Sequence, residues 1–217
     1  MTQALTNNHA HAMDRMYRLT RHVYDLSRRY YLLGRDRLIA QMQTQPGDHV
    51  LEMGCGTARN LIKFNKRHPG RHLYGLDAAS VMLETAQKSL AKHHCDAKLV
   101  CAYAENLDHQ KLFGRDEKFD AIFFSYSLSM MPTWPDAIDA ALANLKPGCK
   151  LYVVDFWDQA YQPRLAAKTL QTWLSWFGVH FRPQLLDYLR EAAAQQQLHL
   201  DIQTVGPRYA YIAQITA

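Results

Sequence analysis

The stretch that decides the fold is "VLEMGCGTARN", residues 50–60. An apolar run ends in Glu52, two glycines follow at positions 54 and 56, and a helix-forming segment comes next. Glycines in such a turn let the backbone approach a ligand closely, and the helix that follows offers free N–H groups. The pattern therefore predicts a buried first strand and a nucleotide-binding loop.

On both sides of this loop the sequence alternates between short apolar runs and amphipathic segments. Such alternation with short connections predicts a doubly wound α/β fold with a mostly parallel sheet. Four further strands are expected at residues 72–78, 97–104, 119–127 and 150–157, and helices at residues 57–68, 80–94 and 135–146.

The C-terminal end breaks this alternation. Residues 198–205 and 208–217 read as two strands joined at Gly206-Pro207, and strands so close in the chain cannot be parallel. The expected fold is thus a seven-stranded, mostly parallel sheet that ends in an antiparallel hairpin. We divide the chain into a helical cap at residues 1–44 and a main domain at residues 45–217, with a helical lid inserted at about residues 158–197.

Composition limits the other possibilities. The 217-residue chain is 48% hydrophobic and carries a formal net charge of +5. We find no apolar run long enough to span a bilayer and no signal-peptide pattern, so we expect a cytoplasmic protein. Its four cysteines include no C-x-x-C pair, which argues against a disulfide framework, and no spacing predicts a metal site.

Two carboxylates indicate which nucleotide the loop holds. A dinucleotide fingerprint would place a third glycine where Arg59 stands, and a pyrophosphate would be repelled by Glu52. A carboxylate suits a ligand with a positive charge, such as S-adenosylmethionine. Asp77, at the end of the second strand, is placed to accept hydrogen bonds from ribose hydroxyls, although it could simply cap the next helix.

With these motifs in order, the chain resembles the class I S-adenosylmethionine-dependent methyltransferases over about residues 46–156. "LEMGCGTARN" is similar to their first motif, "GLDAAS" to their second, and "FDAIFFSYSL" and "LKPGCKLYVVDF" to their fourth and fifth strands. The resemblance implies S-adenosyl-L-methionine as cofactor and S-adenosyl-L-homocysteine as product. Tyr103 stands where family members often have Asp. The implied cofactor-binding residues are Glu52, Gly54, Gly56, Asp77, Ala104, Glu105 and Ser125.

Two further stretches point to the methyl acceptor. "YDLSRRYYLLGRDRLI" (residues 24–39) and "YSLSMMPTW" (residues 126–134) resemble the N-methyltransferases of betaine-lipid synthesis. That family methylates the amine of diacylglyceryl-homoserine three times to give diacylglyceryl-trimethylhomoserine. Aromatic faces attract such cations, and an arginine would hold the homoserine carboxylate. The residues expected to do so are Tyr24 and Tyr126, nearest the chemistry, then Trp134 and Trp157, with Arg28 or Arg35 for the carboxylate.

Other functions fit the same sequence. The acceptor could be phosphatidylethanolamine, a quinone precursor or a soluble small amine; a ring carbon would require a base, which the sequence does not identify. A nucleic-acid-binding protein that uses the basic N-terminal block is a non-enzymatic alternative, although we expect no nucleic acid partner. An apolar stripe within residues 164–181 suits either an interfacial helix or an ordinary packed one, so peripheral contact with the inner face of a membrane is expected only for a lipid acceptor.

Overall fold

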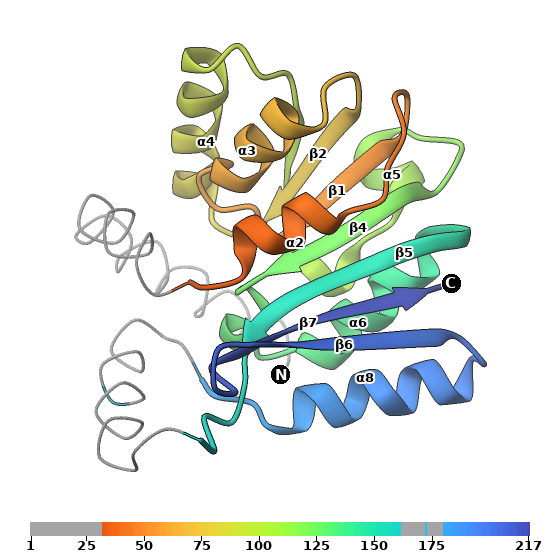
Figure 1. Cartoon of the computed structure of the whole chain (residues 1–217). Coiled ribbons are helices and arrows are strands. Elements are labelled where there is room, and N and C mark those ends of the chain that lie inside the picture. The colour runs from red at the N-terminus through yellow and green to blue at the C-terminus, as the bar shows by residue number, and fades with distance from the viewer. Residues whose placement is uncertain (1–31, 162–171, 173–179) are drawn as a thin grey trace, which may run out of the picture.

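The computed structural model describes residues 32–161, 172 and 180–217. Its centre is a seven-stranded sheet in the order β3-β2-β1-β4-β5-β7-β6 (Figure 1). The strands are β1 (His49–Met53), β2 (His72–Asp77), β3 (Lys98–Cys101), β4 (Phe119–Ser125), β5 (Leu145–Phe156), β6 (His199–Val205) and β7 (Ala210–Thr216).

Strand direction confirms the predicted topology. β1 pairs in parallel with β2 and β4, and the pairs β2–β3 and β4–β5 are parallel as well. β7 runs antiparallel to both β5 and β6. The expected doubly wound sheet with a terminal hairpin is therefore present, and its strand order reverses between β1 and β4, where open α/β sheets bind their ligands.

Helices cover the sheet on two faces. On one face lie α2 (Arg35–Gln41), α3 (Arg59–Arg67) and α4 (Ser80–Lys92), whose apolar residues share one core with β1, β4 and β5. The other face carries α5 (His109–Phe113), α6 (Trp134–Ala143) and α8 (Gln184–Gln195), with a second core. Two short 3-10 turns, η1 (Ala104–Asn106) and η2 (Leu128–Met130), follow β3 and β4.

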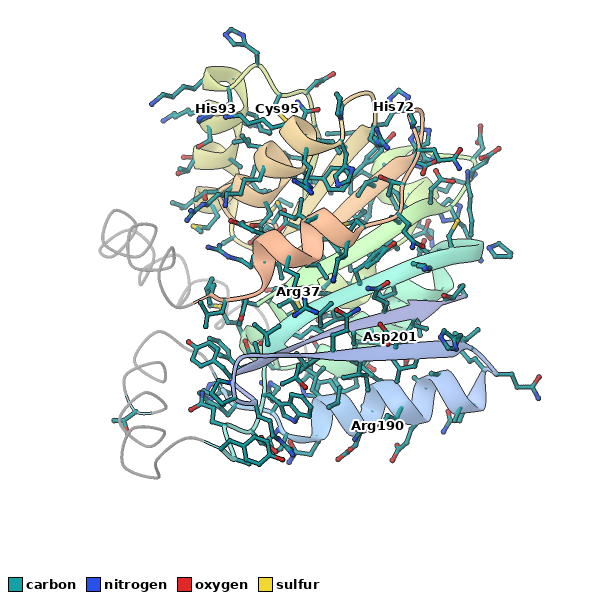
Figure 2. The ribbon with its side chains drawn as sticks, viewed as in Figure 1. Arg37, His72, His93, Cys95, Arg190 and Asp201 are labelled. Atoms are coloured by element: carbon teal, nitrogen blue, oxygen red, sulfur yellow. The ribbon has the colours of Figure 1, made fainter. Side chains whose placement is uncertain are left out.

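The described part of the predicted cap is integrated into the first core. Leu32, Leu38, Ile39 and Met42 are buried there, and α2 lies over β5. Arg37 extends from α2 toward β6 (Figure 2), where its guanidinium donates to Gln203 at 2.7 Å. Residues 1–31 lie outside the described residues, so the cap remains a prediction.

The end of the predicted lid forms a helix on the sheet. Residues 184–195 form α8, which packs on the second face through Leu185, Leu186 and Leu189. Its opposite side carries Arg190, which points away from the sheet (Figure 2). A helix that connects β5 to β6 must cover the sheet in this way, because its apolar stripe has to be buried. The apolar stripe predicted between residues 164 and 181 falls almost entirely outside the described residues.

The described helices lie within residues 32–161, 172 and 180–217. None of the helices there combines the length and the apolar character that crossing a bilayer requires.

Candidate cofactor and acceptor site

The glycine loop meets the end of β4 at the point where the strand order reverses. Gly54 has a φ of 75°, and a Cβ added to it would lie 2.6 Å from the Cβ of Ser127. Ser127 Oγ in turn donates to the carbonyl of Met53 at 2.8 Å. Only glycine fits this turn, because a side chain would be both strained at this φ and in collision with Ser127.

Asp77 closes the other side of the loop. Its Oδ2 accepts a hydrogen bond from the backbone N–H of Gly56 at 2.7 Å, and its Oδ1 accepts one from that of Ala79 at 2.9 Å. Both interpretations made from the sequence are therefore compatible with the structure, since the carboxylate organises the start of α4 and also lies at the loop. It is only partly buried, so it remains open to a ligand.

Glu52 lines a small cavity behind the loop. The side chain is 1% exposed, and its Oε1 accepts a hydrogen bond from Asn60 Nδ2 at 2.7 Å. The cavity encloses about 30 Å³, and Arg35, Arg59 and Ser125 are among its other lining residues. Ser125 Oγ is buried and finds no hydrogen-bond partner among the described residues. Opposite charges and an unused hydroxyl thus face one space, which suits a small group carrying both an ammonium and a carboxylate.

The 3-10 turn η1 completes this edge of the sheet. The N–H of Ala102 donates to the carbonyl of Asp77 at 3.1 Å, which holds the segment leading into η1 beside Asp77. Ala104 is buried there, whereas Tyr103 and Glu105 are partly exposed. Burial and the nearby Glu105 carboxylate raise the pKa of Tyr103. All seven predicted cofactor residues therefore lie at or just beyond the carboxyl ends of β1 to β4.

Tyr126 occupies a different place from the one expected. It has a φ of 55° and is 1% exposed, and its hydroxyl donates to the carbonyl of Leu33. Its ring packs edge-on against Phe156 at 4.7 Å between centroids. Burial raises the pKa of this phenol far above its usual value. This geometry favours a structural role for Tyr126 over the predicted contact with the transferred methyl group.

The predicted aromatic wall is not gathered in one place. Tyr126 belongs to the core beneath α2, whereas Trp134 and Trp157 pack against the core on the opposite face of the sheet. Trp134 packs edge-on against Tyr188 of α8, and the Arg208 guanidinium lies 4.5 Å from the Trp157 ring centre. Tyr126 follows β4, Trp134 begins α6 and Trp157 follows β5, so these residues come from three different elements.

Two predicted acceptor residues, Tyr24 and Arg28, lie outside the described residues. Arg35 is described, and it lies at the start of α2, where its Nε donates to the carbonyl of Leu32 at 3.3 Å. Because Arg35 lines the same cavity as Glu52, it is closer to the predicted cofactor site than to any separate acceptor pocket.

The structure also shows a charged residue that the sequence analysis missed. Asp155, near the end of β5, is 1% exposed; its Oδ2 accepts the N–H of Ser129 at 3.0 Å, and its Oδ1 accepts the N–H of Phe156 at 2.8 Å. Burial raises its pKa from 3.8 to about 6, against the lowering effect of these hydrogen bonds and of Arg182. The only signal in the sequence was an acidic residue that interrupts an apolar strand, "YVVDFW".

Metal-binding clusters are absent from the described part of the chain. No group of three or more His, Cys, Asp or Glu side chains there could hold a metal ion.

The chain is similar to known methyltransferases. Residues 50–148 match the family described as "Methyltransferase domain". A demethylmenaquinone methyltransferase of Lactiplantibacillus plantarum is 26% identical over 93% of this chain and 90% of its own length. A 27-O-demethylrifamycin SV methyltransferase of Amycolatopsis mediterranei is 29% identical over 56% of this chain, and an uncharacterised Methanocaldococcus jannaschii protein is 24% identical over 59%. The chain spans only 43% and 34% of the lengths of these last two relatives.

Solved structures share the fold. A complex of the plantazolicin methyltransferase BpumL with a monoazolic desmethylPZN analogue and SAH superposes with a TM-score of 0.70 at 13% identity, over 99% of this chain and 98% of that one. A Haloferax volcanii complex of the Trm112 methyltransferase activator with its putative methyltransferase gives 0.71 at 15% identity, over 94% and 97%. At these identities the likeness supports the architecture alone.

Proposed function

We propose a methyl acceptor for this chain, which is an S-adenosylmethionine-dependent methyltransferase by its matched domain and its relatives. The acceptor is the amine of a lipid of the diacylglyceryl-homoserine type. Three rounds of methylation would convert it into the betaine lipid diacylglyceryl-trimethylhomoserine.

The cofactor would lie across the carboxyl ends of β1 and β2. In this proposal Glu52 receives the ammonium of the methionine end, Arg35 faces its carboxylate, and Asp77 accepts the ribose hydroxyls. Gly54 and Gly56 both have positive φ, at 75° and 53°, and without side chains they let the ligand lie against the backbone. S-adenosylmethionine supplies a methyl group on a positively charged sulfur, and the adenine would lie against Ala104 and Glu105.

One observation carries the choice of acceptor. The two stretches that resemble the betaine-lipid N-methyltransferases are far apart in the sequence, yet the Tyr126 hydroxyl of one donates to the Leu33 carbonyl of the other. Next to Leu33, Gly34 has a φ of 87° and packs so closely on β5 and β6 that an added Cβ would lie 3.0 Å from Val205 Cγ2. The described end of the first stretch, residues 32–39, therefore meets the start of the second beside the cavity of Glu52 and Ser125. This contact supports a shared role of the two stretches next to the transfer site.

Transfer of the methyl group to an amine needs little acid–base catalysis from the protein. The nitrogen needs a free electron pair aligned with the methyl group, and the protein contributes alignment and exclusion of water. The buried surroundings of Ser125 and Glu52 suit that task. Trp157 could bind the cationic product only on a ring face that Arg208 leaves free, since the guanidinium already lies over the ring at 4.5 Å.

A lipid acceptor also requires that the chain meet a membrane surface. The formal net charge of +5 would favour an anionic surface.

A second candidate acceptor is a demethylmenaquinone-like ring carbon. It is favoured by the Lactiplantibacillus plantarum relative, which matches 93% of this chain. Carbon methylation needs a base to remove a ring proton. Asp155, with its pKa of about 6, is a buried carboxylate at the same edge of the sheet and is the residue that this second proposal assigns as the base.

The two proposals separate in one assay. The protein is incubated with radiolabelled S-adenosylmethionine and either vesicles containing diacylglyceryl-homoserine or reduced demethylmenaquinone in detergent. The proposal predicts label in mono-, di- and trimethylated lipid, and none in the quinone. Label in the quinone alone would overturn the lipid acceptor and establish the second candidate.

A further inference from the structure

Asp155 is the buried charged group that the proposed cofactor site does not use. It lies on β5, its register partner on β7 is Tyr211, and the N–H of Ser129 in η2 donates to it at 3.0 Å. The hydroxyl of Tyr211 is buried beside it without a hydrogen-bond partner among the described residues, and so is Nε of Arg182. Leaving buried polar groups without partners beside a buried carboxylate is costly to a fold, which points to a function.

Residues 126–131, the segment that follows β4, are hydrogen-bonded both to the glycine loop and to Asp155. On the side of the loop, the hydroxyl of Ser127 donates to the carbonyl of Met53, next to Gly54. Its other attachment is the bond from the N–H of Ser129 to Asp155. The carbonyl of Ser129 then accepts the N–H of His180, which leads toward α8.

We propose that Asp155 is a positioning residue for the acceptor side of the transfer site: in the folded protein, with the side chain still buried, its ionised carboxylate fixes residues 126–131 and its protonation loosens them. The proposal rests on the proposed location of the transfer site between β1 and β4. It follows from the geometry, because an ionised carboxylate accepts two N–H groups at once, from Ser129 and Phe156. After protonation one of its oxygens carries a proton, and both N–H groups lose a charged acceptor for a weaker neutral one.

The surroundings of Asp155 make such protonation accessible near neutral pH. The titratable groups that face it are Arg182 ahead of α8, Tyr211 on β7 and Tyr126 beyond β4. Burial raises the pKa of both phenols well above the usual value, so they stay neutral. Hydrogen bonds from Phe156 and Ser129, and then the charge of Arg182, oppose the effect of burial on the pKa of Asp155. The resulting pKa of about 6 places the change between mildly acidic and neutral conditions.

Hydrogen exchange tests this without any methyl acceptor. Deuterium uptake by peptides covering residues 126–131 is measured from about pH 5 to pH 8, corrected for intrinsic exchange, in the wild type and in Asp155→Asn. In the wild type we expect protection of this segment to fall about tenfold to a hundredfold as the pH drops through about 6, the effect of losing a hydrogen bond to a charged group. Asp155→Asn should show the lower protection at every pH.

The control is Asp187→Asn, which removes an exposed carboxylate that pairs with Arg190 at 2.7 Å on the outer side of α8. It should follow the wild type throughout. Wild-type protection and pH dependence in Asp155→Asn would overturn the proposal. An equal loss of protection in β1 and β4 would also overturn it, because Asp155 would then contribute only to global stability. Loss of methyl transfer to a given acceptor bears on the proposed function alone, since exchange requires no acceptor.

Discussion

Asp155→Asn should change the stability of the protein in opposite directions at high and low pH. Folding raises the pKa of Asp155 from 3.8 to about 6 because the side chain is buried. The folded state therefore holds a proton between these two values that the unfolded state has released. This group's contribution to stability is most favourable below about pH 4, and it declines as the pH rises through 6.

The magnitude follows from the two pKa values. A rise from 3.8 to about 6 corresponds to about 3 kcal/mol lost at pH 8, at about 1.4 kcal/mol per pH unit. Asparagine removes this loss but can satisfy only one of the two N–H groups, which costs about 1–2 kcal/mol. We expect Asp155→Asn to be about 1–2 kcal/mol more stable than the wild type at pH 8, and less stable by a similar amount near pH 4.

Urea unfolding, followed by circular dichroism at several pH values, measures this difference directly. The sign of the difference should reverse near about pH 5, where the growing penalty of the ionised carboxylate equals the cost of the asparagine. A variant that is less stable than the wild type by the same amount at every pH would refute the reasoning, since the ionised carboxylate would then carry no penalty in the folded protein.

Two further substitutions test the site. Gly54→Ala should lower the free energy of unfolding by well over the roughly 1 kcal/mol expected for Gly47→Ala. Both glycines have positive φ, but only at Gly54 would the added Cβ also lie 2.6 Å from Ser127 Cβ. Urea unfolding of both variants measures the two losses, and equal losses would contradict the packing argument. Tyr126→Phe should cost about 1–2 kcal/mol of stability by leaving the Leu33 carbonyl without its donor, with little change in affinity for S-adenosylhomocysteine. A large fall in kcat at unchanged stability would instead restore the predicted catalytic role of Tyr126.

The sequence predicted the architecture well because the architecture depends on local patterns. Alternating apolar and amphipathic segments, the glycine loop and the Gly206-Pro207 turn each leave a mark within a few residues. The strand order and the terminal hairpin then follow from rules of connection, and the structure confirms both. The ends of elements were less predictable, since β5 already begins at Leu145, before the "PGC" turn.

The acceptor side was predicted less well because it depends on which face of the sheet each residue occupies. Tyr126 and Trp157 were expected in one wall, yet they belong to cores on opposite faces. Asp155 went unnoticed because its importance comes from burial and from the N–H of Ser129, a partner 26 residues away in the chain. Neither property can be derived from local sequence patterns.

The proposed methyl transfer depends most directly on cofactor binding at the carboxyl ends of β1 and β2. Isothermal titration calorimetry with S-adenosylhomocysteine tests it on the wild type, on Asp77→Ala and on the exposed control Asp187→Ala. We expect one molecule bound per chain, an affinity reduced about tenfold or more in Asp77→Ala through the loss of ribose hydrogen bonds to a charged group, and no change in the control. No binding to the wild type, or equal affinity in wild type and Asp77→Ala, would contradict the proposed site.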